Sequence, residues 1–391
     1  MINTLDQIFV LLQHWLVGFL PASLQPAAGV LLGVAAIICL FPALFALTTV
    51  FERKGLGRIQ NRIGPNRVGP FGLFQPIADG IKSLTKEDIV PLSADAAVHF
   101  LAPVVLVVAV FMGFAVLPMG RKMVLVDMDA GLLFYFAMSA STELSVFMAG
   151  WSSRNKYSLL GAMRAVAQMI SYEVPLLLSS VTVVMIAGSL SLSKIVEAQS
   201  GYTWGLPHWY IFTPWGFAGF VMYAIATTAE TNRSPFDLPE GESELVAGYH
   251  TEYSGFKFAL FFLGEYLAMF SISGLGTTLF LGGWSAPFSF LAWVPSWIWF
   301  FLKLMLSIFV FIWMRGTLPR LRQDQLMNFA WKFVLPICLL NLLVAALWRF
   351  LGAGWPRWVV CSAILMAAYV GLGLLEMHRG KIGPRSYRYA E

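Results

Sequence analysis

Apolar runs long enough to cross a lipid bilayer recur along the whole length of this 391-residue chain. A transmembrane helix needs about 20 largely apolar residues, because the hydrocarbon core is about 30 Å thick and each residue adds about 1.5 Å. Hydrophobic residues make up 58% of the sequence and charged residues only 12%. We therefore expect an all-α polytopic integral membrane protein, with residues 1–391 forming a single membrane domain. The nine expected spans are about Gly29–Val50, Phe100–Leu117, Leu132–Trp151, Leu159–Gly188, Trp215–Thr228, Phe256–Leu281, Trp297–Met314, Phe333–Leu351 and Trp358–Leu375.

Two shorter apolar segments are predicted to lie in the membrane interface. Leu5–Leu20 is too short to span comfortably and is closed by Pro21 and Pro26. A cleaved signal peptide is the alternative, but the segment lacks a basic region before its apolar stretch, so we favour an interfacial segment over residues 1–25. Phe74–Leu84 has the spacing of an amphipathic helix.

The basic residues predict the orientation of the chain. Cytoplasmic loops of membrane proteins are enriched in Lys and Arg. If the basic segment Arg53–Lys86 is cytoplasmic, most other Lys and Arg residues fall on the same side, and the N-terminus lies outside with the C-terminus inside. The expected cytoplasmic loops are residues 52–97, 152–158, 230–255 and 315–332. The expected outer face receives only Arg121, Lys122, Lys194, Arg349 and Arg357.

Several function classes lack their sequence signatures. Cys39, Cys338 and Cys361 lie in apolar spans without a C-x-x-C neighbour, which argues against iron–sulfur and zinc sites. The five histidines are scattered, and there is no phosphate-binding loop or dinucleotide fingerprint. We expect no flavin, iron–sulfur cluster or metal on this chain. The basic charge balance reflects membrane topology, so no nucleic-acid partner is expected.

Acidic residues gather in one stretch, Ala229–Glu244, although charged residues make up only 12% of the chain. Part of this acidity has an ordinary explanation. Asp237 and Glu240 have the spacing of a helix capping box, and the first turns of a helix favour anions. That explanation does not extend to Glu230, which closes an apolar span, or to Glu265, which lies inside the next one.

Four carboxylates fall within or beside the expected spans, namely Glu143, Glu173, Glu230 and Glu265. Ionisable residues inside a membrane are costly and usually functional. Lys303 is the only basic residue in the interior of a span, because Arg164, Lys257 and Arg349 lie near span ends. These acids therefore cannot all be neutralised by buried bases. We expect them to titrate as a coupled set, which is the behaviour that a proton relay needs.

The basic segment that follows the first span is rich in glycine and proline, and it also contains acids such as Glu52 and Asp79. This composition favours a shaped pocket wall, although a simple basic loop is the alternative. Arg315 ends a later span at the inner membrane face. A functional role is one interpretation, and the alternative is that its side chain simply extends to the membrane–water interface.

At four segments the chain resembles the family of H-type membrane subunits of bacterial respiratory complex I, the counterpart of mitochondrial ND1. The matching segments are ERKGLGRIQNRIGPNRVGPFGLFQPIADGIK, NKYSLLGAMRAVAQMISYE, ETNRSPFDLPEGESELVAGYHTEYSGFKFALFFLGEY and RGTLPRLRQDQLMNFAWK. The resemblance covers about Phe51–Leu335. It implies a subunit of a proton-translocating NADH–quinone oxidoreductase in the bacterial inner membrane, where quinone is the substrate and the redox centres belong to partner subunits. The implied partners are hydrophilic quinone-site subunits, small membrane-arm subunits and lipids.

The resemblance also implies two sets of site residues. Those matching the quinone tunnel are Arg53, Arg62, Asp79, Lys82, Phe236 and Arg315. Those matching the acidic chain that leads into the membrane arm are Glu143, Glu173, Glu230, Glu240, Glu242, Glu244 and Glu265.

Two other functions stay open from the sequence. One is the equivalent subunit of a ferredoxin- or hydrogenase-linked membrane complex. The segments QPIADGIK and SPFDLPE favour the quinone-linked type instead. The other is an independent proton/solute antiporter, which would predict inverted internal repeats that the sequence does not display.

Overall fold

A computed structural model describes residues 5–203, 205–237, 246–352 and 354–379, with the side chains of residues 375–379 left aside. Eight helices in this part of the chain are long and apolar enough to cross a membrane. They correspond to eight of the nine expected spans. The ninth, expected at Trp215–Thr228, is α9 (Pro214–Glu230), a helix of 17 residues. The fold class predicted from hydropathy is therefore confirmed.

The centre of the bundle is α11 (Gly255–Phe280), whose second half is almost completely buried. It packs against α3 (Gln25–Ile59), α5 (Ala96–Phe114), α9 and α12 (Ser296–Thr317). The core that they share is aromatic and aliphatic, with Phe270 and Phe280 among its fully buried side chains.

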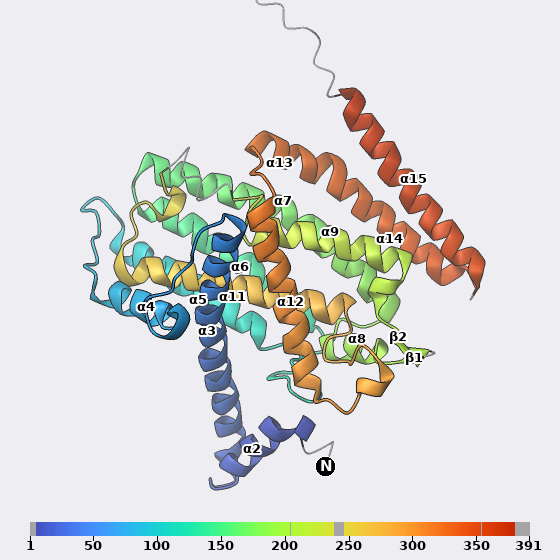
Figure 1. The fold of residues 1–391 in the computed structure, drawn as a ribbon, viewed down its shortest axis with the longest axis horizontal. Helices are drawn as coiled ribbons and strands as arrows, with labels where there is room; N and C mark the ends of the chain where they lie inside the picture. The colour runs from blue at the N-terminus through green and yellow to red at the C-terminus, as the bar shows by residue number, and fades with distance from the viewer. Residues whose placement is uncertain (1–4, 204, 238–245, 353, 380–391) are drawn as a thin grey trace, which may run out of the picture.

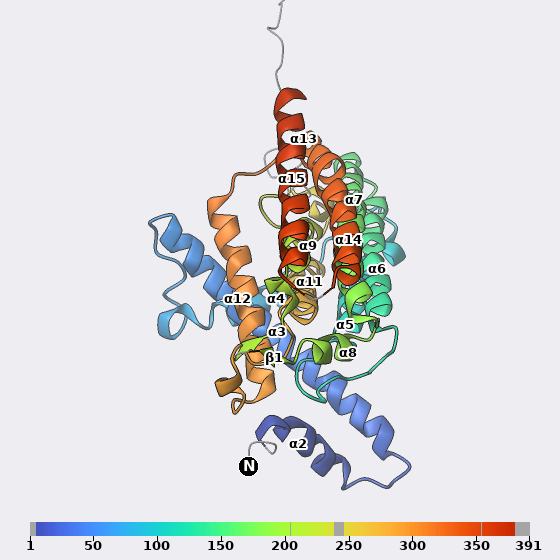
Figure 2. The same cartoon turned by 90° about the vertical axis from the view of Figure 1, so that its right-hand side faces the viewer.

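The remaining helices build out from this centre. α6 (Gly131–Ser152) and α7 (Lys156–Ala187) pack with α5 and α9, and α14 (Leu335–Phe350) packs on α7 and α9. The last helix, α15 (Trp355–Arg379), runs beside α14 and α9 at the edge of the molecule (Figures 1 and 2). α3 extends away from the bundle at its N-terminal half, where it meets α2 (Ile8–Val17) (Figure 1).

Short elements complete the chain at the helix ends. The two-residue strands β1 (Tyr202–Thr203) and β2 (Leu206–Pro207) pair antiparallel after α8 (Leu192–Ala198). The 3-10 turns are η1 (Pro70–Gly72), η2 (Tyr210–Phe212), η3 (Gly248–His250) and η4 (Ser289–Leu291). α13 (Gln323–Phe329) continues through a π-helical turn, η5 (Ala330–Val334), into α14.

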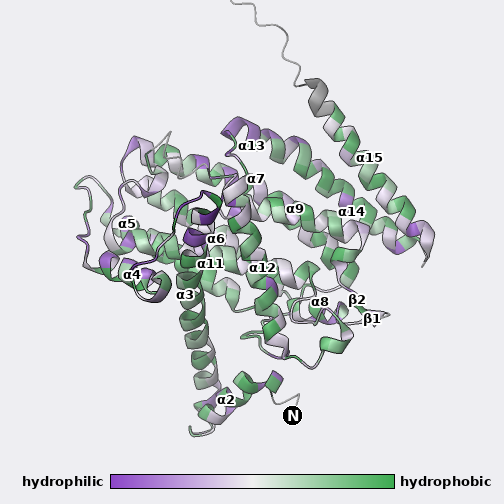
Figure 3. Cartoon of the chain, in the orientation of Figure 1, coloured by the Kyte–Doolittle hydropathy of each residue, from purple (hydrophilic) through white to green (hydrophobic). Residues whose placement is uncertain are grey.

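Both predicted interfacial segments form helices. The N-terminal one is α2, shorter than the expected apolar stretch. The second is α4 (Gln75–Thr85), which has no buried residue and exposes Ile77, Ile81 and Leu84. Hydrophilic residues gather where α3 passes into α4 and again at α13, whereas the long helices are largely hydrophobic (Figure 3).

Candidate functional site

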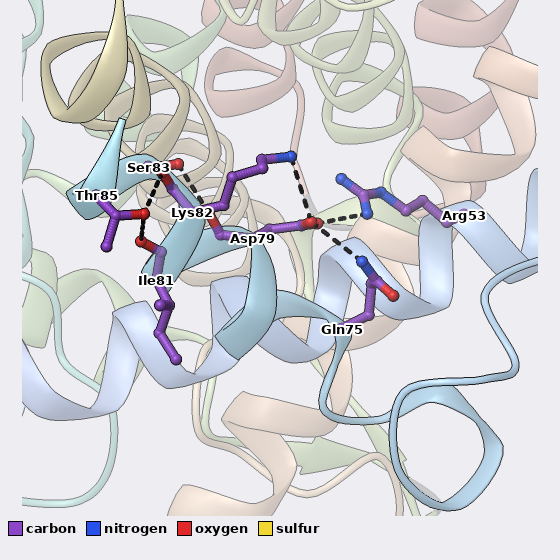
Figure 4. A network of polar contacts seen from close by, with 7 residues as sticks. All are labelled: Arg53, Gln75, Asp79, Ile81, Lys82, Ser83 and Thr85. Atoms are coloured by element: carbon purple, nitrogen blue, oxygen red, sulfur yellow. Dashed lines mark hydrogen bonds and ion pairs between the residues drawn. The ribbon is translucent and has the colours of Figure 1, made fainter. Parts of the chain in front are cut away.

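A polar network joins the C-terminal end of α3 to α4 (Figure 4). Asp79 accepts a hydrogen bond from the Arg53 guanidinium at 2.6 Å and another from the Gln75 amide at 3.1 Å. The Lys82 ammonium lies 3.7 Å from the same carboxylate. Burial alone would raise the pKa of Asp79, but these hydrogen bonds and the nearby charges of Arg53 and Lys82 lower it below its usual value.

Directly before Arg53, the Glu52 carboxylate is the hub of a buried cluster. It accepts a bond from Arg233 at 3.2 Å, and it is also bonded by Arg315 and by the Tyr266 hydroxyl. The Arg233 guanidinium lies over the Tyr266 ring, 3.9 Å from its centroid. We call Glu52, Arg233, Tyr266 and Arg315 the Glu52 cluster. Its four members come from α3, α11, α12 and the segment after α9, so it holds these elements together.

Arg233 connects the Glu52 cluster to the next carboxylate. Burial would lower the pKa of Arg233, but the surrounding Tyr266, Glu52 and Glu265 side chains raise it, so the guanidinium is a permanent positive charge. Glu265 of α11 thus interacts with the same cation as Glu52. The Glu265 carboxylate also accepts a bond from the Tyr249 hydroxyl at 2.7 Å and lies 3.3 Å from His250 Nε2.

The partners of Glu265 are presented by η3, which sits tightly against α7. A side chain at Gly161 of α7 would begin 2.7 Å from the Gly248 backbone, so only glycine allows this approach. Tyr249 and His250 are both buried there. Neither was singled out from the sequence, since their role depends on a fold that places η3 over α11.

A cavity of about 50 Å³ lies between α5, α6, α7, α9 and α11. Glu265 and Tyr249 line it together with Glu230, the last residue of α9, and polar side chains such as Thr142 and Asn232. Its size exceeds the roughly 10–15 Å³ that one water needs. The cavity therefore has the room and the polar lining to hold water between the two carboxylates.

Glu230 has fewer partners than Glu52. Its side chain is buried, and its Oε2 atom has no hydrogen-bond partner among the described residues. The Gln168 amide donates to the backbone carbonyls of Ala229 and Phe236, each at 2.8 Å, which fixes the end of α9. Gln168 thus lies on the face of α7 that packs against α9.

Glu143 of α6 and Glu173 of α7 continue the series of acids. They interact electrostatically with one another, and each also interacts with Glu230. Glu143 Oε1 is buried without a hydrogen-bond partner among the described residues. The four predicted intramembrane acids are thus brought into one series, in the order Glu265, Glu230 and the Glu143–Glu173 pair.

Asp237 interacts electrostatically with Arg315 and Arg233 of the Glu52 cluster and with Glu265. Burial raises the pKa of its carboxyl, and the nearby guanidiniums of Arg315 and Arg320 only partly oppose this effect. Its Oδ1 atom is buried with no hydrogen-bond partner among the described residues. The predicted capping box falls partly on Glu240, which lies outside the described residues, as do Glu242 and Glu244.

The other predicted quinone-site residues are dispersed. Arg62 bonds to Gln60 at 2.8 Å on an exposed turn and does not join the Asp79 network. Phe236 is buried in the core with its ring centroid 5.4 Å from that of Tyr172. The structure therefore brings Arg53, Asp79 and Lys82 together, and it places Arg315 in the Glu52 cluster.

Two members of the Glu52 cluster, Glu52 and Arg233, are not among the predicted site residues. The sequence shows Glu52 only as an acid in a basic segment, and Arg233 only as a residue of the acidic stretch. Each lies within three residues of a predicted site residue, so the surrounding motifs do point to this part of the molecule. Among the described residues, no group of three or more His, Cys, Asp or Glu side chains could hold a metal ion.

Comparison with known proteins identifies relatives along most of the chain. Residues 32–346 match the family model described as NADH dehydrogenase. In Dehalococcoides mccartyi strain CBDB1, the H subunit of NADH-quinone oxidoreductase is 48% identical over 350 residues, which cover 89% of this chain and 95% of the relative. The protein of the same name from Bacillus mycoides strain KBAB4 is 51% identical over 315 residues, covering 80% of this chain and 92% of the relative.

Proposed function

This chain belongs to the NADH dehydrogenase family and is a membrane subunit of an NADH-quinone oxidoreductase, and from that premise we propose that it forms the quinone-binding tunnel and couples quinone reduction to proton translocation. Quinone is the substrate in this proposal. Its electrons come from partner subunits, which carry the redox centres.

The tunnel is proposed to run past the Asp79 network and the Glu52 cluster. Reduction of a quinone to a quinol consumes protons and changes the charge beside whichever groups hold the headgroup. Arg53 and Arg315 supply fixed positive charge there, and Arg53 stays partly exposed at the α3–α4 junction. A developing negative charge is stabilised by such guanidiniums.

The observation that carries the coupling half of the proposal is the continuity of the charged groups. Arg315 and Arg233 share Glu52, Arg233 interacts with Glu265, and Glu265 shares a cavity with Glu230. Glu230 then interacts with Glu143 and Glu173. A change of charge at the Glu52 end would alter the electrostatic interactions of each following group in turn. Cavity water would carry protons between Glu265 and Glu230.

Location and partners follow from the same premise. We propose the inner membrane of a bacterium as the site, with the N-terminus on the periplasmic side and the C-terminus in the cytoplasm. The Glu52 cluster then faces the cytoplasm, where hydrophilic subunits would cover it. The acids would point toward small subunits of the membrane arm.

A ferredoxin- or hydrogenase-linked complex is the alternative assembly. Copurification from the native membrane distinguishes the two, because the redox subunits that accompany this chain identify the electron donor. An independent antiporter would instead catalyse ion-coupled uptake as the isolated chain in liposomes.

Arg53→Ala tests the quinone half of the proposal. We expect NADH–quinone reductase activity of the assembled complex to fall at least about tenfold, because the guanidinium that holds Asp79 and borders the tunnel is lost. NADH oxidation by a hydrophilic artificial acceptor should keep its wild-type rate. Equal loss of both activities would mean failed assembly, and full retention of both would contradict the proposal. Arg58→Ala is the matched control, because it removes a guanidinium from the last turn of the same helix and outside the Asp79 network.

A further inference from the structure

A second cavity, of about 110 Å³, lies at the end of the molecule opposite the Glu52 cluster. Ser296, the first residue of α12, lines this cavity, whereas Arg315 near the last residue of the same helix bonds Glu52. A helix of 22 residues rises about 33 Å, close to the thickness of a bilayer core. This second cavity, which we call the α12 cavity, therefore lies at the opposite membrane face.

Two opposite charges line the α12 cavity without pairing with each other. Asp6 is 8% exposed, and its Oδ1 accepts a bond from the Ser296 backbone N–H at 2.6 Å. Arg121 holds its guanidinium 5.1 Å from the centroid of the Trp284 ring. Among the described residues neither side chain takes part in an ion pair. A buried carboxylate without a cation is costly, so the site is electrostatically incomplete.

The cavity is also lined by aromatic side chains, including Trp284, Trp299 and Tyr202. The Trp299 indole N–H is buried with no acceptor among the described residues. Tryptophan and tyrosine collect at the level of lipid headgroups, and the faces of their rings attract cations.

Apolar surface surrounds this polar cavity. The adjoining helix α2 exposes Leu12, Trp15 and other large apolar side chains, and Phe290 and Trp293 are exposed on the loop before α12. Phe9 of α2 contacts Trp297 of α12, with their ring centroids 5.3 Å apart, so α2 is docked beside the cavity. Such a surface belongs against acyl chains.

We propose that the α12 cavity binds the headgroup of a zwitterionic aminophospholipid, of the phosphatidylethanolamine class, drawn from the surrounding bilayer. Its ammonium is held by Asp6 and the aromatic faces, and its phosphate by Arg121 and the Trp299 N–H. One carboxylate and one guanidinium match one ammonium and one phosphate. An anionic headgroup without an amine would leave Asp6 uncompensated.

The site depends on the N-terminal segment. Asp6 precedes residue 32, where the match to the family model begins. The lipid would therefore tie a segment outside that match to the first turn of α12, whose far end carries Arg315.

The test uses the assembled complex, purified in detergent and stripped of loosely held lipid. Native mass spectrometry then counts the tightly retained copies of added phosphatidylethanolamine, phosphatidylcholine and phosphatidylglycerol. We expect the wild type to retain one copy of phosphatidylethanolamine more than either of the other lipids. Phosphatidylcholine lacks the ammonium N–H donors, and phosphatidylglycerol lacks the amine.

Asp6→Asn should lose that copy, with an affinity roughly tenfold lower. Asparagine keeps an oxygen for the Ser296 N–H, so the start of α12 stays capped. Arg121→Gln should have the same effect, and Arg121→Lys should restore part of the binding because a lysine still attracts phosphate. Lys122→Gln, a neighbouring cation that does not line the cavity, should match the wild type.

Two results would overturn the proposal. One is a wild-type complex that retains the three lipids equally. The other is unchanged retention of phosphatidylethanolamine in both Asp6→Asn and Arg121→Gln. The first would mean that no site on the complex selects the ethanolamine headgroup, and the second that such a site lies outside the α12 cavity.

Discussion

The Glu52 cluster and the cavity between Glu265 and Glu230 both bury carboxylates, but they differ in how the charge is compensated. Glu52 is bonded by two guanidiniums and a tyrosine hydroxyl. Glu230 keeps a carboxylate oxygen without a partner among the described residues and faces a cavity with room for water. A carboxylate held by two fixed cations is suited to keep its charge, whereas one beside water is suited to exchange a proton.

Glu265 belongs to both regions. It shares Arg233 with the Glu52 cluster, and it shares the cavity with Glu230. Its remaining partners are the Tyr249 hydroxyl and the His250 ring, which do not supply the two guanidiniums that hold Glu52. We infer that Glu265 is the junction at which fixed charge gives way to exchangeable charge.

Glu52→Gln should have the largest effect because it removes the anion of the cluster and leaves the buried Arg233 beside Arg315. Breaking a buried ion pair in this way costs about 3–5 kcal/mol. We expect little assembled complex in the membrane and a lower melting temperature for any that remains, measured by blue-native electrophoresis and thermal shift.

The matched control for Glu52→Gln is Glu87→Gln, which neutralises an exposed acid with no ion pair among the described residues. It should assemble normally. Normal assembly and stability of the Glu52→Gln complex would show that the charge of Glu52 does not hold the Glu52 cluster together.

Asp237→Asn should change the stability of the complex less than Glu52→Gln does, and it should raise stability instead of lowering it. Burial raises the pKa of Asp237, so the folded state holds its proton more tightly than the unfolded state does. Ionisation therefore costs stability, and this cost grows as pH rises above the ordinary aspartate value of about 4. The variant should melt at the same temperature as the wild type near pH 4 and at a higher one at pH 8. A variant that melts lower at pH 8 would contradict this account.

Asp79→Asn should have the smallest effect on stability, within about 1 kcal/mol, because Arg53 and Asp79 are both partly exposed. The lowered pKa of Asp79 keeps its carboxylate charged until the solution is more acidic than about pH 4. The contribution of this pair is therefore present at neutral pH and lost only in acid. Any effect of Asp79→Asn on quinone reductase activity should therefore be the same from pH 6 to pH 8. An effect that changes with pH in that range would contradict the lowered pKa of Asp79.

Hydropathy and local spacing predicted the helices well. The span that contains Glu173 lies where its apolar run predicted it, and the helix over residues 75–85 lies where amphipathic spacing predicted one over Phe74–Leu84. These features depend on near neighbours in the sequence, so a single chain reveals them. The acids were predicted as a group because each interrupts an apolar run.

The pairings were not predicted from local pattern. Glu52 and Arg233 are 181 residues apart, and Glu52 and Arg315 are 263 apart. Only the tertiary packing of α3 against α12 and the segment after α9 brings them together. For the same reason the sequence alone could not show that Glu52 is held by two arginines whereas Glu230 faces a cavity.

The most direct test of the coupling is the number of protons translocated per NADH oxidised by the reconstituted complex carrying Glu230→Gln. Glutamine keeps the size of the side chain and cannot exchange a proton at neutral pH. We predict normal assembly, continued quinone reduction, and a proton yield clearly below that of the wild type. Glu197→Gln, at an exposed acid of α8, serves as the control and should keep the full yield. A wild-type proton yield from assembled Glu230→Gln would contradict the central claim that this acid relays protons.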